Sequence, residues 1–172
     1  MGFSNRDAGK AMGEYLISRG HRVLAYVGGQ EPRSEARLQG FEQSAQRAQH
    51  VTVHALMLNQ SASYAAGRQA LVELLASHPR LDALFFSNDA LAVGALMECQ
   101  RRGIRVPHDL AIAGFANLDI AEEMVPALTT VQVEATAMGT CAADLIVKRL
   151  SGVPLPSNRI DLGFSIVVRD SA

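Results

Sequence analysis

Three small polar residues, Ser87, Asn88 and Asp89, separate an apolar segment over 81–86 from a second apolar segment that follows at once. Side-chain oxygens of Asn and Asp accept backbone N–H groups from the open first turn of a helix, so this pair can begin a helix. In an open parallel sheet, the same junction is where ligands meet the carboxyl ends of the strands. Asn88 and Asp89 therefore either cap a helix or hold a hydroxylated small molecule, and this stretch alone leaves both open.

Polar residues also follow the other predicted strands. They are Gln30 and Arg33 after the first strand, Asn59 and Ser61 after the second, Asn88 and Asp89 after the third, and Asn117 and Asp119 after the fourth. Arg37 lies one turn into a helix that Ser34 can cap, and its fixed donors suit vicinal hydroxyls or a carboxylate. The alternative for Arg37 is an exposed helix arginine. Convergence of these groups on one sheet edge predicts a small-molecule site.

Strands and helices must alternate along the chain to bring these residues to one edge. The pattern predicts strands over 22–27, 51–57, 81–86, 109–115 and 128–133, and helices over 8–19, 35–48, 63–77, 89–102 and 136–150. A polar loop is expected between the last two of these strands, and a tail over 160–168 is typical of one or two strands broken at Gly163. This order predicts an α/β fold with a doubly wound parallel sheet and helices on both faces.

The predicted helix over 89–102 departs from one-sided burial. It carries no charged residue between Ala90 and Met97, so more than one of its faces is apolar. Such a helix either lies in the middle of a covered sheet or meets a second subunit, and a two-fold homodimer is the commonest assembly of that kind.

Residue types that would support catalysis or metal binding are not placed together. His50 and His54 straddle a strand start, which separates them by roughly 13 Å at 3.3 Å per residue, so they cannot share an ion as a helical pair would. No glycine-rich phosphate loop and no nucleophile elbow follows a predicted strand. Cys99 and Cys141 lie in helical patterns and are expected to be free thiols. We therefore expect no enzyme activity, no metal and no cofactor.

Charge and hydropathy argue against nucleic-acid-binding, secreted and membrane proteins. The 172 residues include 16 Lys and Arg against 17 Asp and Glu, which gives a net charge of −1. No basic stripe forms, so this chain alone is a poor candidate for binding nucleic acid. Neither a signal peptide nor an apolar run of the roughly 18–20 residues that a membrane span needs is visible.

Several runs together resemble the LacI/GalR family of transcriptional regulators. They are Gly9–Gly20 leading into 21–26, Arg37–Phe41, Ser87–Gly94, Val106–Phe115 and Pro126–Val131. The resemblance spans almost the whole chain in the family's order. The branch of gluconate-responsive repressors is the most similar in Ser63-Tyr64, Glu98–Arg101 and Asp161–Phe164.

This resemblance implies an effector-binding domain of the periplasmic-binding-protein-like type I fold, in a cytoplasmic DNA-binding repressor. Residues 1–128 and 153–172 would form mainly the carboxyl-side subdomain, and 129–152 would return as a strand and a helix to the amino-side subdomain. The DNA-binding headpiece and most of the amino-side subdomain would lie outside this chain, so operator DNA would be bound only through that headpiece. The implied partner in the cleft is a sugar or a sugar acid such as gluconate.

The resemblance also assigns roles to single residues. Arg37, Asn88 and Asp89 match positions that contact the effector in the family, and Gln30 and Ser61 join them through their predicted places at strand ends. Where the family often has Asp-Asp, this chain has Ala116-Asn117, so Asn117 is expected to take over part of the acceptor role. Val133 and Ala135 replace a polar and an aromatic contact that are frequent in the family, which disfavours a neutral pyranose. The implied homodimer contacts are Val93, Leu96, Met97 and Met124.

Two other functions fit the same fold class. A periplasmic sugar-binding protein of an uptake system would need a signal peptide and a complete first lobe. A doubly wound enzyme would need a nucleophile, a base or a cofactor loop that the motifs do not supply. Neither alternative is preferred over the effector-sensing part of a repressor.

Overall fold

A computed structural model of the chain describes residues 2–46, 48–153 and 160–172. The sheet has the strand order β2-β1-β3-β4-β5-β6, in which β1 to β5 are parallel and β6 runs antiparallel to β5. The strands are β1 (Val23–Gly29), β2 (Thr52–Leu58), β3 (Ala83–Phe86), β4 (Ala111–Phe115), β5 (Thr129–Gln132) and β6 (Ser165–Val167). The helices are α1 (Asn5–Ser18), α2 (Pro32–Gln46), α3 (Tyr64–Ser77), α4 (Asp89–Arg102), α5 (Asp119–Glu123) and α6 (Ala135–Leu150).

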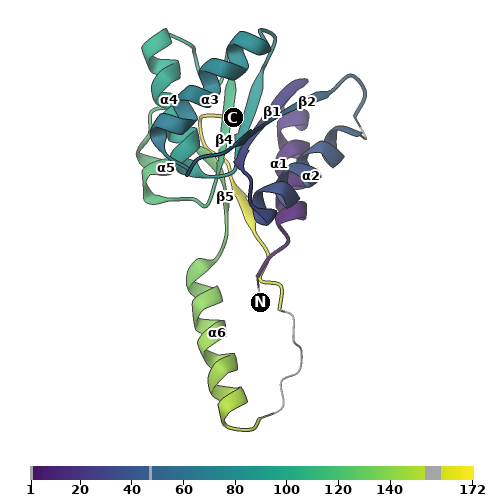
Figure 1. The fold of residues 1–172 in the computed structure, drawn as a ribbon, viewed down its shortest axis with the longest axis vertical. Coiled ribbons are helices and arrows are strands. Elements are labelled where there is room, and N and C mark those ends of the chain that lie inside the picture. The colour runs from purple at the N-terminus through teal and green to yellow at the C-terminus, as the bar shows by residue number, and fades with distance from the viewer. Residues whose placement is uncertain (1, 47, 154–159) are drawn as a thin grey trace.

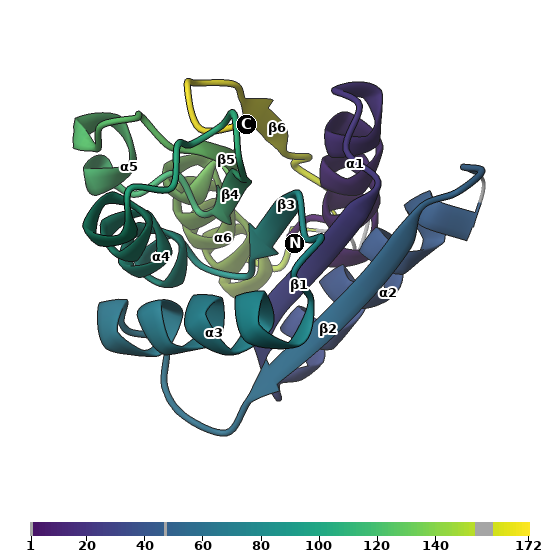
Figure 2. The same cartoon turned by 90° about the horizontal axis from the view of Figure 1, so that it is seen from above.

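The predicted doubly wound α/β sheet with helices on both faces is confirmed. Along β1, Leu24 and Tyr26 pack with α1 and α2, whereas Ala25 and Val27 pack with α3 and α4. Figure 2 shows the two helix pairs on opposite faces of the sheet. The central strands β3 and β4 are buried along their whole length, as expected for parallel strands that are covered on both sides.

One local expectation differs from the structure, one agrees with it, and two predicted segments lie partly outside the described residues. The region expected as a loop after β4 contains the short helix α5, whose first residue is Asp119. The tail contains only β6 among the described residues of 160–168, and Gly163 precedes it with φ +70°, which ends the extended chain there. Two predicted segments extend beyond the described residues. The predicted helix over 35–48 includes Arg47, and the predicted carboxyl-side segment includes 154–159, none of which the structure describes.

Helix α6 extends away from the rest of the molecule (Figure 1). None of its described residues is buried, and Ile146, Val147 and Leu150 are each at least 60 % exposed. Strand β5, by contrast, pairs with β4 and β6 inside the sheet. The part of the segment 129–152 that projects from the sheet therefore begins after Gln132.

Each helix pair makes direct backbone contact at two glycines. A Cβ on Gly9 of α1 would overlap the carbonyl oxygen of Arg37 in α2, and a Cβ on Gly40 of α2 would overlap that of Arg6 in α1. Gly67 of α3 and Gly94 of α4 repeat this reciprocal arrangement on the other face of the sheet. The backbones of the paired helices approach closely because no side chain separates them.

We expect Gly9→Ala to lower the free energy of unfolding by about 1–3 kcal/mol, because the added methyl forces α1 and α2 apart. Gly139→Ala is the matched control, since a Cβ there meets nothing within 4 Å on exposed α6. The control is expected to keep or raise stability by up to about 1 kcal/mol through helix propensity. Equilibrium denaturation in urea measures both changes, and a Gly9→Ala protein as stable as wild type would show that the contact is not tight.

Candidate functional site

A cavity of about 300 Å³ lies at the carboxyl edge of the sheet, where four connections meet. The β1–α2 connection contributes Gly29, Glu31, Arg33 and Arg37 to its walls, and the β2–α3 connection contributes Leu58, Gln60, Ser61 and Ala62. Ser87, Asn88 and Leu91 come from the β3–α4 junction, and Phe115 and Ala116 from the end of β4. The parallel order of β1 to β4 brings these segments to one edge, as the sequence predicted.

Arg37 lies at the centre of this edge and is only 7 % exposed. Its Nε donates to Asn5 Oδ1 at 2.8 Å and its Nη1 donates to the Ser87 carbonyl oxygen at 2.8 Å. The guanidinium carbon lies 3.7 Å from the centre of the Phe115 ring, a cation–π contact. Arg37 is thus a fixed wall of the cavity and not the exposed helix arginine that was its alternative.

Burial lowers the pKa of the Arg37 guanidinium from its ordinary value, and the nearby Glu31 carboxylate opposes this shift. An arginine remains protonated in a protein despite such a shift, so Arg37 carries a full positive charge. Its two described hydrogen bonds use two of the N–H donors. The three other N–H groups make no hydrogen bond among the described residues, and the side chain belongs to the cavity lining.

The base of α2, which carries Arg37, is fixed to the sheet by Tyr26. The Tyr26 hydroxyl lies 2.9 Å from the Ser34 carbonyl oxygen, to which it donates, and 2.8 Å from the Ser34 hydroxyl. Both residues are fully buried, and burial raises the pKa of the Tyr26 hydroxyl. Gly28 leaves room for this pair, since a Cβ there would overlap the Ser34 hydroxyl.

Asn88 caps helix α4 and also lies in the cavity lining. Its Oδ1 accepts the Ala90 N–H at 2.8 Å and caps α4, while the residue also lines the cavity. The cap uses the side-chain oxygen alone, so the amide nitrogen is free to donate elsewhere. Capping and ligand binding are therefore compatible at this position.

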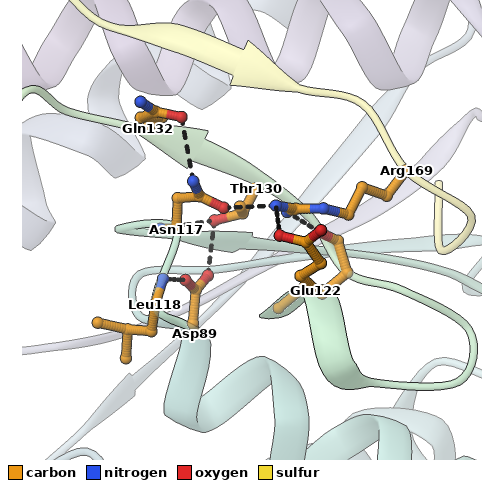
Figure 3. Close-up of polar contacts among 8 residues, drawn as sticks. Asp89, Asn117, Leu118, Glu122, Thr130, Gln132 and Arg169 are labelled. Atoms are coloured by element: carbon orange, nitrogen blue, oxygen red, sulfur yellow. Dashed lines mark hydrogen bonds and ion pairs between the residues drawn. The ribbon is translucent and has the colours of Figure 1, made fainter. Parts of the chain in front are cut away.

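Asp89 lies in a different place from its predicted one. It is fully buried and does not line the cavity. Its Oδ1 accepts the Thr130 hydroxyl at 2.6 Å and its Oδ2 accepts the Leu118 N–H at 2.8 Å (Figure 3). Burial raises the pKa of this carboxyl, whereas these hydrogen bonds lower it. Asp89 therefore shapes the wall of the site instead of reaching into it, because both of its oxygens are used inside the protein.

Asn117 is also turned into the protein. Its Nδ2 donates to Gln132 Oε1 at 3.0 Å, and its Oδ1 accepts from Arg169 Nη2 at 2.9 Å (Figure 3). Its neighbour Ala116 lines the cavity in its place. Both residues have positive φ, at 117° for Ala116 and 52° for Asn117, and the Ala116 N–H donates to the Val131 carbonyl oxygen at 2.8 Å. These contacts turn the Asn117 side chain toward Gln132 and Arg169, and Asn117 is not among the residues that line the cavity.

The other predicted ligand residues lie at the rim. Ser61 lines the cavity, and Gln30 lines an adjoining depression that shares Gly29, Glu31 and Ser61 with it. Sequence reasoning did not single out Glu31, Phe115 or Asn5. Glu31 follows the end of a predicted strand and Phe115 is the last residue of one, so their positions could have identified them. The contact of Asn5 with Arg37 depends instead on helix packing that no local sequence pattern records.

Two of the four predicted homodimer contacts belong to the core of this chain. Val93 and Leu96 are fully buried between α4, α3 and the sheet, so neither offers surface to a partner. The apolar character of α4 comes from this internal burial. Met97 is 41 % exposed and Met124 is partly buried, so both retain surface on this side of the molecule.

Within residues 2–46, 48–153 and 160–172, no group of three or more His, Cys, Asp or Glu side chains is placed to hold a metal ion. Among the same residues, no helix is long and apolar enough to cross a membrane. Cys99 and Cys141 are free thiols, as expected.

The chain shares extended similarity with known regulators. The family model of the periplasmic binding protein-like domain matches residues 14–172. A relative is the HTH-type transcriptional regulator GntR of Escherichia coli K12, 38 % identical over 96 % of this chain and 50 % of its own length. Among solved structures, the transcription regulator GntR from Chromobacterium violaceum superposes with a TM-score of 0.95 at 38 % identity, over 98 % of this chain and 63 % of that one. The structure of a sugar-binding transcriptional regulator (LacI family) from Escherichia coli complexed with phosphate superposes with a TM-score of 0.88. It is 28 % identical, and the match covers 99 % of this chain and 62 % of that one.

These relatives are transcriptional regulators by name rather than enzymes. The chain spans about half the length of the curated relatives it matches.

Asp89→Ala is expected to lower the free energy of unfolding by about 2–4 kcal/mol, because it leaves the Leu118 N–H and the Thr130 hydroxyl without an acceptor. Asp119→Ala removes an exposed carboxylate near the same turn and serves as the control, with a change of about 0.5 kcal/mol or less. Urea denaturation of both variants checks the difference. A small loss at Asp89 would mean that water replaces the carboxylate.

Proposed function

The chain belongs to the periplasmic-binding-protein-like domain family, among the LacI/GalR regulators, and we propose that it senses a sugar or sugar acid at the cavity around Arg37. The position of Arg37 carries this proposal. A fixed and nearly buried cation with free N–H donors is suited to a carboxylate or to vicinal hydroxyls. A periplasmic sugar-binding protein and an enzyme are not favoured, because the relatives are named transcriptional regulators.

A sugar acid suits the charges of the cavity better than a neutral sugar. The cavity lining contains two arginines, Arg33 and Arg37, and one carboxylate, that of Glu31. It therefore carries an excess positive charge. The amide nitrogen of Asn88 and the hydroxyl of Ser61 offer hydrogen bonds of the kind that sugar hydroxyls need. A volume of about 300 Å³ is at the lower end of small-molecule sites and suits a ligand of monosaccharide size. Gluconate is the effector that these features and the GntR relatives favour most.

The rest of the regulator follows from the same family membership. We place the chain mainly in the carboxyl-side subdomain, with α6 reaching toward the amino-side subdomain that would close over the ligand. Ligand closure would shift the equilibrium between two arrangements of the subdomains. Operator DNA would be bound through a separate headpiece in the cytoplasm, since this chain has a net charge of −1.

We propose that the regulator is a homodimer and that the surface near Met97 and Val125 takes part. Val125 is 77 % exposed, and the Gln100 side chain of α4 donates to its carbonyl oxygen, which holds the Val125 segment against that helix. Tyr64, which is 48 % exposed, lies across from Gly94 of α4. These exposed apolar residues replace Val93 and Leu96 as the expected contacts.

Arg37→Ala in the full-length protein is expected to weaken gluconate binding by at least about 30-fold, because truncating one partner of a buried charged pair costs about 2–5 kcal/mol. Isothermal titration calorimetry measures the affinity. Arg80→Ala, which removes an exposed arginine outside the cavity, is the control and should bind as wild type does. Equal affinity in the two variants would remove Arg37 from the site.

Val125→Asp combined with Met97→Asp is expected to shift the full-length protein from dimer to monomer at low micromolar concentration, because two charges would enter an apolar contact. Sedimentation velocity reports the mass. Val168→Asp places the same charge at another exposed valine, 58 % exposed, and should leave the dimer intact. A double variant that remains dimeric contradicts this choice of surface.

A further inference from the structure

The guanidinium of Arg37 is held by a side chain that does not itself line the cavity. Asn5 Oδ1 accepts the Arg37 Nε–H at 2.8 Å, and Asn5 is the first residue of α1. Its place is set by the helix contact described above. Gly9, one turn further along α1, lies against the Arg37 backbone, so the same helix face that meets the backbone presents Asn5 to the guanidinium.

The segment before α1 also supports the ring that underlies Arg37. The Phe3 ring lies 5.8 Å from the Phe115 ring, and the guanidinium carbon of Arg37 lies 3.7 Å from the centre of the same Phe115 ring. Gly2 pairs with the chain near Asp161, donating to the Ile160 carbonyl oxygen at 3.0 Å. Residues 2–5 therefore contact both the cation and its aromatic support, and they are themselves anchored to a distant part of the chain.

We propose that Asn5 is the positioning residue for the effector-binding arginine, a role that rests on the proposed function of the cavity. With Nε fixed by Asn5 and Nη1 by Ser87, the remaining N–H groups of Arg37 face the cavity in one orientation before the ligand arrives. A ligand then binds without ordering the side chain first, which is the free-energy gain of preorganisation. Asn5 acts through Arg37 and does not touch the effector.

Two variants of the full-length protein, Asn5→Ala and Asn5→Ser, test this role. Alanine removes the acceptor of the Arg37 Nε–H, and the serine hydroxyl is too close to the backbone to reach that N–H group. The Nε–H signal of Arg37 in NMR, assigned by its loss in Arg37→Lys, reports the contact without any ligand. We expect slow solvent exchange of this proton in wild type and in Asn5→Asp, which keeps an acceptor, and fast exchange in the Ala and Ser variants. Arg6→Ala, an exposed neighbour on α1, is the control and should leave the signal unchanged.

Calorimetry with gluconate measures the consequence. The Ala and Ser variants are expected to bind roughly tenfold more weakly than wild type, as for loss of a hydrogen bond to a charged group, with their thermal midpoints near that of Arg6→Ala. An unchanged Nε–H exchange rate or an unchanged affinity in both variants overturns the proposal. A wild-type protein that binds no sugar or sugar acid refutes the proposed function instead, and the NMR signal then still decides whether Asn5 holds Arg37.

Discussion

Backbone contact between paired helices is the constraint on which the rest of this structure depends. Gly9 and Gly40 let α1 and α2 touch on one face of the sheet, and Gly67 and Gly94 do the same for α3 and α4 on the other. In each pair, a glycine meets the carbonyl group three residues before the partner glycine. A larger residue at any of these positions would separate the helices, and the connections at the carboxyl edge would move with them.

The consequence for the cavity is specific. Arg37 lies three residues before Gly40, and Leu91 lies three residues before Gly94, and these two of the four residues that meet the glycines also line the cavity. The same contacts that close the two helix layers thus fix the backbone of two residues in the cavity lining. The geometry of the site is set mainly by helix packing, with the ends of the strands supplying the edge on which it is built.

The sequence predicts the architecture well, because alternating apolar strands and amphipathic helices leave few arrangements. It is less informative about which way a polar side chain turns. Asn88 and Asp89 are adjacent and chemically similar, yet one lines the cavity and the other is sealed beneath it. The difference arises from Thr130 and Leu118, which come from β5 and from the turn after β4 and meet Asp89 only in the folded chain. Val93 and Leu96 were misassigned for a related reason, since an uncharged helix has the same sequence pattern whether α3 or a second subunit covers it.

Asp89 and Arg37 have separate roles near this edge because their partners differ. Both oxygens of the Asp89 carboxylate accept hydrogen bonds inside the protein, so it supports the turn at Ala116 and Asn117, where both residues have positive φ. Arg37 has neutral partners, an amide oxygen, a backbone carbonyl and an aromatic ring, which orient the cation without cancelling its charge. A direct ion pair between Arg37 and a buried carboxylate would have stabilised the empty cavity and removed the attraction for an anionic ligand. Because Asp89 lies in the wall, Glu31 is the one carboxylate among the described residues of the lining beside Arg33 and Arg37, which leaves the excess positive charge that the proposed sugar-acid ligand would meet.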